Sequence, residues 1–302
     1  MSTQPAISSG PDKVVARAIE QIGDIGTLPE ITLKIIATVE DPHSTARDLH
    51  EIVTHDLALS TRILRVVNSA FYGLPGQVAS IERAIIMLGL NAVKNIAIAA
   101  SLNRVFRGGR ISRRYSARDL WVHAVAVGAA SKMLVDELTL PLPDEAFVAG
   151  LLHDIGLVVM LQSNLPAMQE LMRLTENVRD GESAGLPGDE QFRRAEQHLF
   201  GASHEAFGEG LSHQWKFPRS FHFVTGYHHR PGELERDNRL LTQIIHVADR
   251  LSAQLQIGMV LPVDTGPIAA DTLSELGLTD AHLAAVREKL ADQVAQAMQL
   301  LD

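Results

Sequence analysis

Seven histidine and aspartate side chains in the second half of the chain are of the types that bind metal ions. Neutral imidazole nitrogens and carboxylate oxygens are ligands for Fe, Mn, Zn or Ni, and ligands from different helices can converge inside a helical bundle. The chain has no cysteine, so histidine and carboxylate must hold any metal alone. The candidate metal ligands are His123, His153, Asp154, His204, His228, His229 and Asp249.

The adjacent pair His153-Asp154 is the sharpest of these features. It is expected late in an apolar helix over Asp144–Leu161, where a polar pair without a partner would be costly to bury. Two interpretations stay open for this pair and for Asp249. They coordinate a metal, or they form a structural hydrogen-bond network, since either satisfies buried polar atoms. Ligation of a second metal by the later histidines is a further hypothesis.

The elements that must position these side chains are predicted to be helices. Apolar residues recur at helical spacing, and no segment shows the sustained alternation typical of strands, so the predicted fold class is all-α. Proline and glycine mark the expected helix boundaries, including Leu88-Gly89-Leu90, and residues 175–191 are expected to form a loop or a loose helix end. The helices expected in the second half cover Ser116–Leu138, Asp144–Leu161, Glu190–Trp215, Pro218–His229, Arg239–Leu255 and Asp280–Leu301.

Composition limits the classes of protein to consider. With 302 residues, 46% of them hydrophobic and 21% charged, the chain is expected to fold into about two compact units. A net charge of −9 argues against a protein that grips nucleic acid across its whole surface. The N-terminus does not look like a signal peptide, and the longest apolar runs fall short of the ~20 residues that cross a bilayer. We therefore expect a cytoplasmic protein without membrane insertion.

A shift in composition divides the chain. Residues 1–11, rich in Ser, Pro and Gly, are expected to be a disordered tail, followed by an N-terminal helical lobe over 12–110 and a second lobe over 111–302. The boundary falls in the arginine-rich run Arg104–Arg118, which Gly108-Gly109 interrupts. This run is either a solvated linker or a patch that binds phosphate or an acidic partner, because guanidinium groups suit phosphate oxygens.

The order of these motifs resembles the HD superfamily of metal-dependent phosphohydrolases and, more specifically, the HDOD family, the HD-related output domain of bacterial signalling proteins. The resemblance runs from about Ile19 to Ala253. In the first half it rests on LP at 28–29, HDLALSTRILRVVNSAFYG at 55–73 and SIERAIIMLGL at 80–90. In the second half it rests on Trp121 and His123, AFVAGLLHDIG ending at Gly156, Glu196, FG at 200–201, His204 and HH at 228–229.

The resemblance implies an all-helical protein of two lobes, an N-terminal helical bundle packed on a divergent HD-type bundle. Family members are generally regarded as regulatory outputs without demonstrated hydrolase activity. His123, His153, Asp154 and Asp249 match the superfamily's primary ligand positions. His204, His228 and His229 match the extra histidines that the related HD-GYP phosphodiesterases use to hold further metal.

Two departures from the HD-GYP enzymes bear on catalysis. Leu157 stands where those enzymes carry a lysine near the substrate phosphate, and the Gly-Tyr-Pro signature is absent after His229. Leucine supplies neither charge nor proton, so the resemblance favours a module without catalytic activity.

Three hypotheses follow. The first is a signal-transduction module that binds a protein partner and keeps the histidines and aspartates as a metal staple or a structural polar core. The second is a metal-dependent phosphohydrolase of a nucleotide or cyclic dinucleotide, with Arg230 or the arginine-rich run binding phosphate. The third is a nucleotide-binding pseudo-enzyme. The resemblance nearly fills the chain, so we expect the input signal to arrive through another polypeptide or a small ligand.

Overall fold

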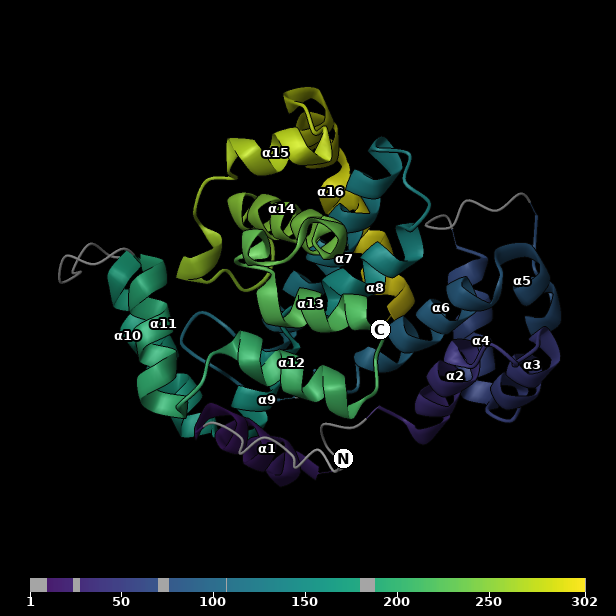
Figure 1. Ribbon diagram of the computed structural model, residues 1–302, viewed down its shortest axis with the longest axis horizontal. Coiled ribbons are helices and arrows are strands. Elements are labelled where there is room, and N and C mark those ends of the chain that lie inside the picture. Colours follow the sequence, from purple (N-terminus) through teal and green to yellow (C-terminus); the bar gives the residue numbers. More distant parts are fainter. Residues whose placement is uncertain (1–9, 24–27, 70–75, 107, 180–187, 302) are drawn as a thin grey trace, which may run out of the picture.

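The computed structural model describes residues 10–23, 28–69, 76–106, 108–179 and 188–301, and this part of the chain is helical without a β-strand (Figure 1). The all-α class predicted from the hydrophobic pattern is therefore confirmed. Two lobes lie side by side in the view of Figure 1, the smaller built from the helices within residues 30–102 and the larger from the remaining helices. The tail expected over residues 1–11 lies outside the described residues up to position 9.

The smaller lobe is a bundle of short helices around its own apolar core. The side chain of Asn68 caps the end of one helix and fixes the segment that follows: its amide donates to Leu64 O and Val78 O, and Val78 N donates to Asn68 Oδ1 at 2.6 Å. A positive φ of 86° at Gly89 separates two of the helices at the boundary that the sequence predicted. Its helices are α2 (Glu30–Glu40), α3 (Ala46–Thr54), α4 (Leu57–Val67), α5 (Ile81–Leu88) and α6 (Leu90–Leu102).

The larger lobe is arranged around α7, which packs against α8, α14 and α16. Buried residues lie on every face of α7, as expected for the central helix of a bundle. The helices of this lobe are α7 (Ala117–Glu137), α8 (Pro143–Leu152), α9 (Ile155–Ser163), α10 (Leu165–Arg179), α11 (Gly188–Phe200), α12 (His204–Gln214), α13 (Arg219–Tyr227), α14 (Leu240–Gln254), α15 (Ala270–Leu276) and α16 (Asp280–Leu301), with short 3-10 turns over Pro231–Glu233, Arg236–Asn238 and Pro262–Asp264.

Two helices that the sequence predicted as continuous are each broken in two. The helix expected over 144–161 divides into α8 and α9 at His153-Asp154, and the one expected over 190–215 divides into α11 and α12 at residues 201–203. Apolar residues flank the first break on both sides, whereas at the second Gly201 takes a positive φ of 77° and Ser203 caps α12. The segment expected over 175–191 as a loop or a loose helix end is helical at both ends, where α10 extends to Arg179 and α11 begins at Gly188, and residues 180–187 lie outside the described part of the chain.

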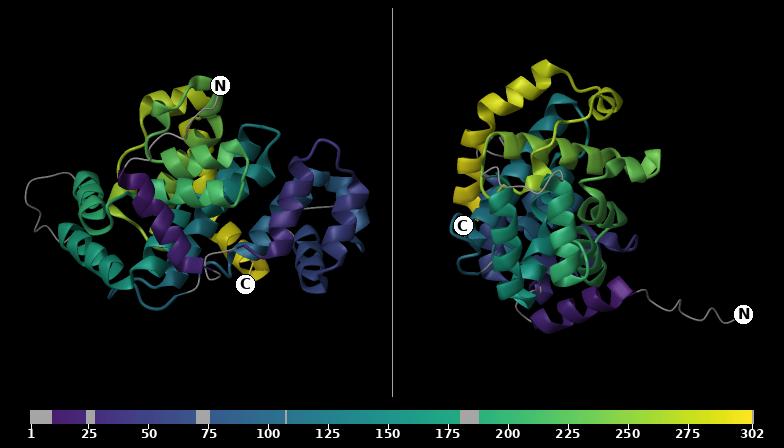
Figure 2. Two further views of the ribbon diagram at one scale, coloured as in Figure 1. Left: turned by 60° about the horizontal axis from the view of Figure 1, so that its bottom comes forward. Right: turned by 90° about the vertical axis from the view of Figure 1, so that its left-hand side faces the viewer.

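Helix α1 (Gly10–Ile22) belongs by its contacts to the larger lobe, although the sequence grouped it with the N-terminal one. It packs against α9 and α12, as the two views in Figure 2 show. Its apolar face, which includes Val15 and Ile19, is buried there. A Cβ at Gly210 of α12 would lie 2.5 Å from the Val15 side chain, so the missing side chain leaves the space that α1 fills.

The two lobes share helices α2 and α6. On α6, Ile96 and Ala97 belong to the core of the smaller lobe, whereas Ile98 and Leu102 belong to the core of the larger one. Every residue of α6 from Ala92 to Leu102 is buried. The lobes are therefore packed through a common buried helix.

The segment Pro143–Ser163, which contains α8 and α9, is long and apolar enough to cross a membrane by length and composition alone. The sequence reading had found no apolar run of that length, because charged and polar residues interrupt this one. In the fold, 89% of the segment's most apolar window is buried inside the protein, as expected for the central helices of a bundle.

Candidate metal centre

The close crossing of α7 and α8 brings the first two candidate ligands together. A Cβ at Gly150 of α8 would lie 2.5 Å from the Cα of Gly128 on α7, so the two backbones touch where neither residue has a side chain. His123 lies on α7 one turn before this contact, and His153 is the C-cap of α8 just after it. Their ring centroids are 5.3 Å apart.

The break between α8 and α9 turns Asp154 toward the same point. His153 ends α8 and Asp154 begins α9 as its N-cap, so consecutive residues serve two helices. Gly156 then lets α9 approach α12 closely, because a Cβ there would lie 1.8 Å from the backbone oxygen of His204. The polar pair that the sequence placed inside one helix is thus the junction of two helices.

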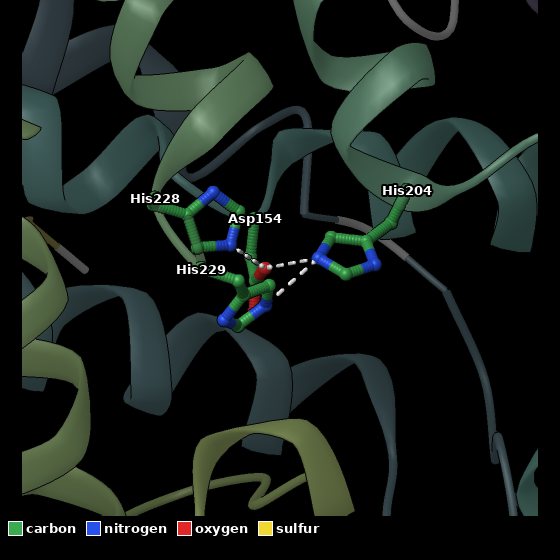
Figure 3. Close-up of side chains that lie close together, drawn as sticks. All are labelled: Asp154, His204, His228 and His229. Carbon is green, nitrogen blue, oxygen red and sulfur yellow. Dashed lines mark hydrogen bonds and ion pairs between the residues drawn. The ribbon is translucent and has the colours of Figure 1, made fainter. Parts of the chain in front are cut away.

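His204, His228 and His229 approach Asp154 from two further helices (Figure 3). His204 is the first residue of α12, and His228 and His229 follow the end of α13. His204 Nε2 lies 3.7 Å and His228 Nε2 3.4 Å from Asp154 Oδ1. His229 Nε2 lies 3.1 Å from His204 Nε2.

The two carboxylates each face more than one imidazole. Asp154 Oδ2 is 3.4 Å from His153 Nε2 and 3.9 Å from His123 Nε2, while its other oxygen faces His204 and His228. Asp249 Oδ1 is 3.2 Å from His123 Nε2 and 4.0 Å from His153 Nε2. All seven residues singled out in the sequence as ligands thus lie in one cluster.

Outer hydrogen bonds fix the imidazole tautomers. His153 Nδ1 lies 2.7 Å from Gly150 O, His228 Nδ1 lies 3.1 Å from Val224 O, and His204 Nδ1 lies 2.6 Å from Glu196 Oε1. Each acceptor requires a proton on Nδ1, so in the neutral ring the Nε2 lone pair points inward. A partner of this kind on the outer nitrogen is what metal-ligating histidines have.

Charges and burial set the pKa values inside the cluster. Burial alone would raise the pKa of Asp154, but the surrounding imidazoles, His153 first, hold it well below its usual range. Burial would lower the pKa of His204, but the carboxylates of Glu196 and Asp154 outweigh burial and raise it to about 10. Burial, with the neighbouring imidazoles, lowers the pKa of His229. The ionised Asp154 therefore lies beside a protonated His204 and a neutral His229, and a metal ion bound by His204 Nε2 would displace the proton from that nitrogen.

These residues fit a divalent metal. Buried atoms without a hydrogen-bond partner include Nε2 of His123, His153 and His228, Asp154 Oδ1 and both carboxylate oxygens of Asp249. Buried polar atoms normally have partners, and a metal ion bound by them would satisfy these. Two groups have ligand atoms close enough for one ion each, His123, His153 and Asp249 in the first, and Asp154, His204, His228 and His229 in the second.

Sequence reasoning missed two carboxylates of this centre. Asp264 lies with His229 and Asp249 in a third group of ligand atoms, and burial together with the charge of Asp249 raises its pKa well above the usual range. Asp264 follows the segment that carries the resemblance, and no spacing marked it. Glu196 accepts from both His204 N and His204 Nδ1. The sequence did contain a signal for Glu196, because this residue stands eight positions before His204 in the family motif.

The cluster is sealed from solvent. Its histidine and aspartate side chains are 0 to 2% exposed. Arg230, the predicted phosphate ligand, lies beside the centre with its guanidinium in other contacts, 3.3 Å from Glu205 Oε2 and 2.9 Å from Glu233 Oε2. Leu157 is 0% exposed. A phosphoester has no described route to these metal-ligating atoms in this conformation.

Comparison with known proteins supports the family. A sequence model of the HDOD domain matches residues 25–231. A curated relative, an uncharacterized protein of Treponema pallidum (strain Nichols), is 26% identical over 226 residues, which are 72% of this chain and 40% of the relative. The chain thus spans about two fifths of that relative's length.

Solved structures share the fold. An HDOD domain protein of unknown function from Geobacter sulfurreducens matches with a TM-score of 0.72 at 21% identity, covering 96% of this chain and 98% of that one. A proposed phosphohydrolase from Shewanella amazonensis SB2B matches with a TM-score of 0.66 at 22% identity, covering 95% and 98%. At this level of identity the likeness shows the helical architecture alone.

Proposed function

The chain belongs to the HDOD domain family and is an HD-related signalling domain, and from that premise we propose that it is a non-catalytic regulatory module that acts by binding a protein partner. In this proposal a divalent metal, Fe, Mn, Zn or Ni, is held by the buried cluster as a structural staple. The proposed site of action is the cytoplasm.

The observation that carries the proposal is the sealed cluster. Catalysis of phosphoester hydrolysis needs a metal with a position open to water and substrate. The side chains of Asp154 and Asp249 are 2% and 0% exposed. The position of the catalytic lysine is filled by the buried Leu157, which supplies no charge for a substrate phosphate.

The cluster is well placed to act as a staple. Its ligands come from α7, the α8–α9 junction, α12, the end of α13 and α14, so one ion in each of the two groups would together tie five parts of the larger lobe. The metal would supply the charge that the buried carboxylates require. The residues of the chain set the imidazole tautomers and exclude water.

The smaller lobe offers apolar surface to a protein partner. Leu57 at the start of α4 is 80% exposed and Ile86 on α5 is 74% exposed, with Met87 beside it. Large apolar side chains on the surface are typical of protein contacts when they gather in patches. The same lobe holds no cluster of candidate metal ligands among its described residues, which fits a role in contact and not in chemistry.

The test combines metal analysis with an activity screen. Protein purified without chelator is expected to hold near-stoichiometric metal, which Asp154→Asn loses, while Asp136→Asn, exposed on α7, keeps it. Neither wild type nor variant is expected to turn over a panel of phosphoesters with Mn, Fe or Mg supplied. If the folded protein holds no metal and cannot be reloaded with metal, the cluster is a hydrogen-bond network and the metal staple is excluded.

A metal-dependent phosphohydrolase is the second candidate, because the whole ligand set is intact around Asp154 and Asp249. It requires the larger lobe to open and admit substrate. Metal-dependent hydrolysis by the wild type, lost in Asp154→Asn and kept in Asp136→Asn, would establish this function and overturn the non-catalytic proposal.

A further inference from the structure

Three arginines from distant parts of the sequence gather at the junction of the two lobes, away from the metal centre. Arg62 and Arg65 lie on α4, and Arg104 follows the end of α6. They line a cavity of about 210 Å³ that the C-terminal end of α16 closes. Helix α16 packs against α4 here, and Figure 1 shows its terminus beside the smaller lobe. The remaining lining residues are Ala100, Asn103, Leu300 and Leu301.

The three guanidiniums have no carboxylate partner in the described part of the chain. None of them takes part in an ion pair or hydrogen bond there, whereas Arg173 and Arg239 are each paired with a glutamate at 2.6 to 2.7 Å. Arg62 Nε is buried without any hydrogen-bond partner. Asp56, whose negative charge raises the pKa of Arg62, is engaged as the N-cap of α4 and accepts from Leu59 N.

The three positive charges act on one another, with Arg62 partly buried and Arg65 and Arg104 exposed to solvent. Burial, followed by the positive charge of Arg104, lowers the pKa of Arg62, while Asp56 opposes this only in part. A buried donor without a hydrogen-bond partner is unfavourable, and more so when the group is charged. A bound anion would supply both the missing acceptor for Arg62 Nε and the missing negative charge.

We propose that this cavity binds one or two linked phosphoryl groups of a small soluble ligand, with Arg62, Arg65 and Arg104 as its phosphate ligands. Guanidinium groups donate paired hydrogen bonds in the geometry of phosphate oxygens. A phosphate monoester carries about −1.5 to −2 charges at pH 7, so three guanidiniums complement one or two such groups. The cavity is small, which favours a phosphoryl group over a bulkier anion.

The site gives part of the arginine-rich run a role. Arg104, its first member, reaches this cavity, while Arg110 lies exposed further along the run and contacts the backbone oxygen of Arg113. The cavity lies between α4 of the smaller lobe and α16 of the larger one, so a bound phosphate would bridge the lobes. The inference is independent of the metal centre and of the proposed function.

The test is calorimetric titration of the full-length protein with inorganic pyrophosphate in phosphate-free buffer. We expect saturable binding at one site, with the affinity reduced about tenfold or more in Arg62→Gln and in Arg104→Gln. Arg113→Gln is the matched control, because it removes one charge from the same run outside the cavity. Arg104 is exposed, so its variant keeps the test valid if Arg62→Gln fails to fold.

A further arm identifies the source of the phosphate. Adenosine diphosphate compared with pyrophosphate separates recognition of a nucleotide from recognition of phosphate alone. No saturable binding of pyrophosphate or nucleotide, or an equal loss in Arg113→Gln, would overturn the proposal.

Discussion

Among the imidazoles that point into the cluster, His204 is the one whose outer nitrogen is held by a carboxylate and not by a backbone oxygen. Glu196 accepts from His204 Nδ1 at 2.6 Å and from His204 N at 2.9 Å, and it is fully buried. His153 and His228 use backbone acceptors that no substitution removes. The orientation of His204 therefore depends on one side chain, which makes it accessible to mutation.

Replacement of Glu196 by glutamine is expected to weaken metal binding about 10- to 100-fold, because the amide no longer fixes the tautomer and basicity of His204. The measurement is metal content after dialysis against a graded series of chelator concentrations. Glu190→Gln, on the same helix and paired with Arg194 at the surface, is the control and should match wild type. Equal metal retention in both variants would exclude a positioning role for Glu196.

Leu157 allows a test of whether a catalytic lysine fits this fold. The side chain is 0% exposed, so Leu157→Lys would bury an ammonium group that has lost its water. We expect a loss of about 4 kcal/mol or more in the free energy of unfolding and no gain of hydrolysis, against less than about 1.5 kcal/mol for Leu157→Met. Urea denaturation gives the comparison. A stable Leu157→Lys protein would mean that this position reaches solvent.

How far the site could be predicted depends on the kind of signal each residue carries. Seven candidate ligands could be predicted because histidine and aspartate are costly in apolar helices and because the family motif orders them. Asp264 carries neither signal, since it lies in a short turn where an aspartate is ordinary. The folded chain assigns it to the site, because the turn over Pro262–Asp264 brings it to His229.

At the scale of the helix, the sequence predicts most helix bounds but not the break at His153-Asp154. The helices around α7, α14 and α16 were expected within one or two residues of their bounds, because each has a strong apolar period and clear ends. No proline or glycine lies at His153-Asp154, so local chemistry predicts continuation of the helix there. Tertiary contacts with α12 and α14 impose the break instead.

Gly156 is the residue that allows this arrangement of helices. Its Cβ would lie 1.8 Å from His204 O and 2.7 Å from Gly208 N, both backbone atoms of α12 that cannot move alone. We expect Gly156→Ala to destabilise the fold by about 3 kcal/mol and to lower metal content, because α12 and His204 are pushed away from Asp154. Gly232→Ala has open space and should change stability by about 0.5 kcal/mol or less.

Thermal unfolding and metal content, measured on the same two glycine variants, check this prediction. A Gly156→Ala protein that unfolds at the wild-type temperature and retains its metal would show that α9 and α12 do not touch as described.

At the scale of the whole molecule, the two lobes are expected to unfold as one unit. Helix α6 contributes Ile96 to the core of the smaller lobe and Ile98 to that of the larger, so neither core can lose α6 without disrupting the other. The end of α16 adds a second connection, since Leu300 packs against both cores. The sequence predicted two lobes, but it could not show that they share a buried helix.

Truncating an apolar side chain on either face of α6 should therefore shift a single unfolding transition that both lobes share. Ile96→Ala and Ile98→Ala are each expected to lower the free energy of unfolding by about 2 to 5 kcal/mol. Both tryptophans, Trp121 and Trp215, lie in the larger lobe, so their fluorescence follows that lobe, while amide exchange in α4 follows the smaller one. The two probes should give the same urea midpoint in every variant. A midpoint that moves for one probe alone would mean that the lobes are thermodynamically independent and that α6 belongs to only one of them.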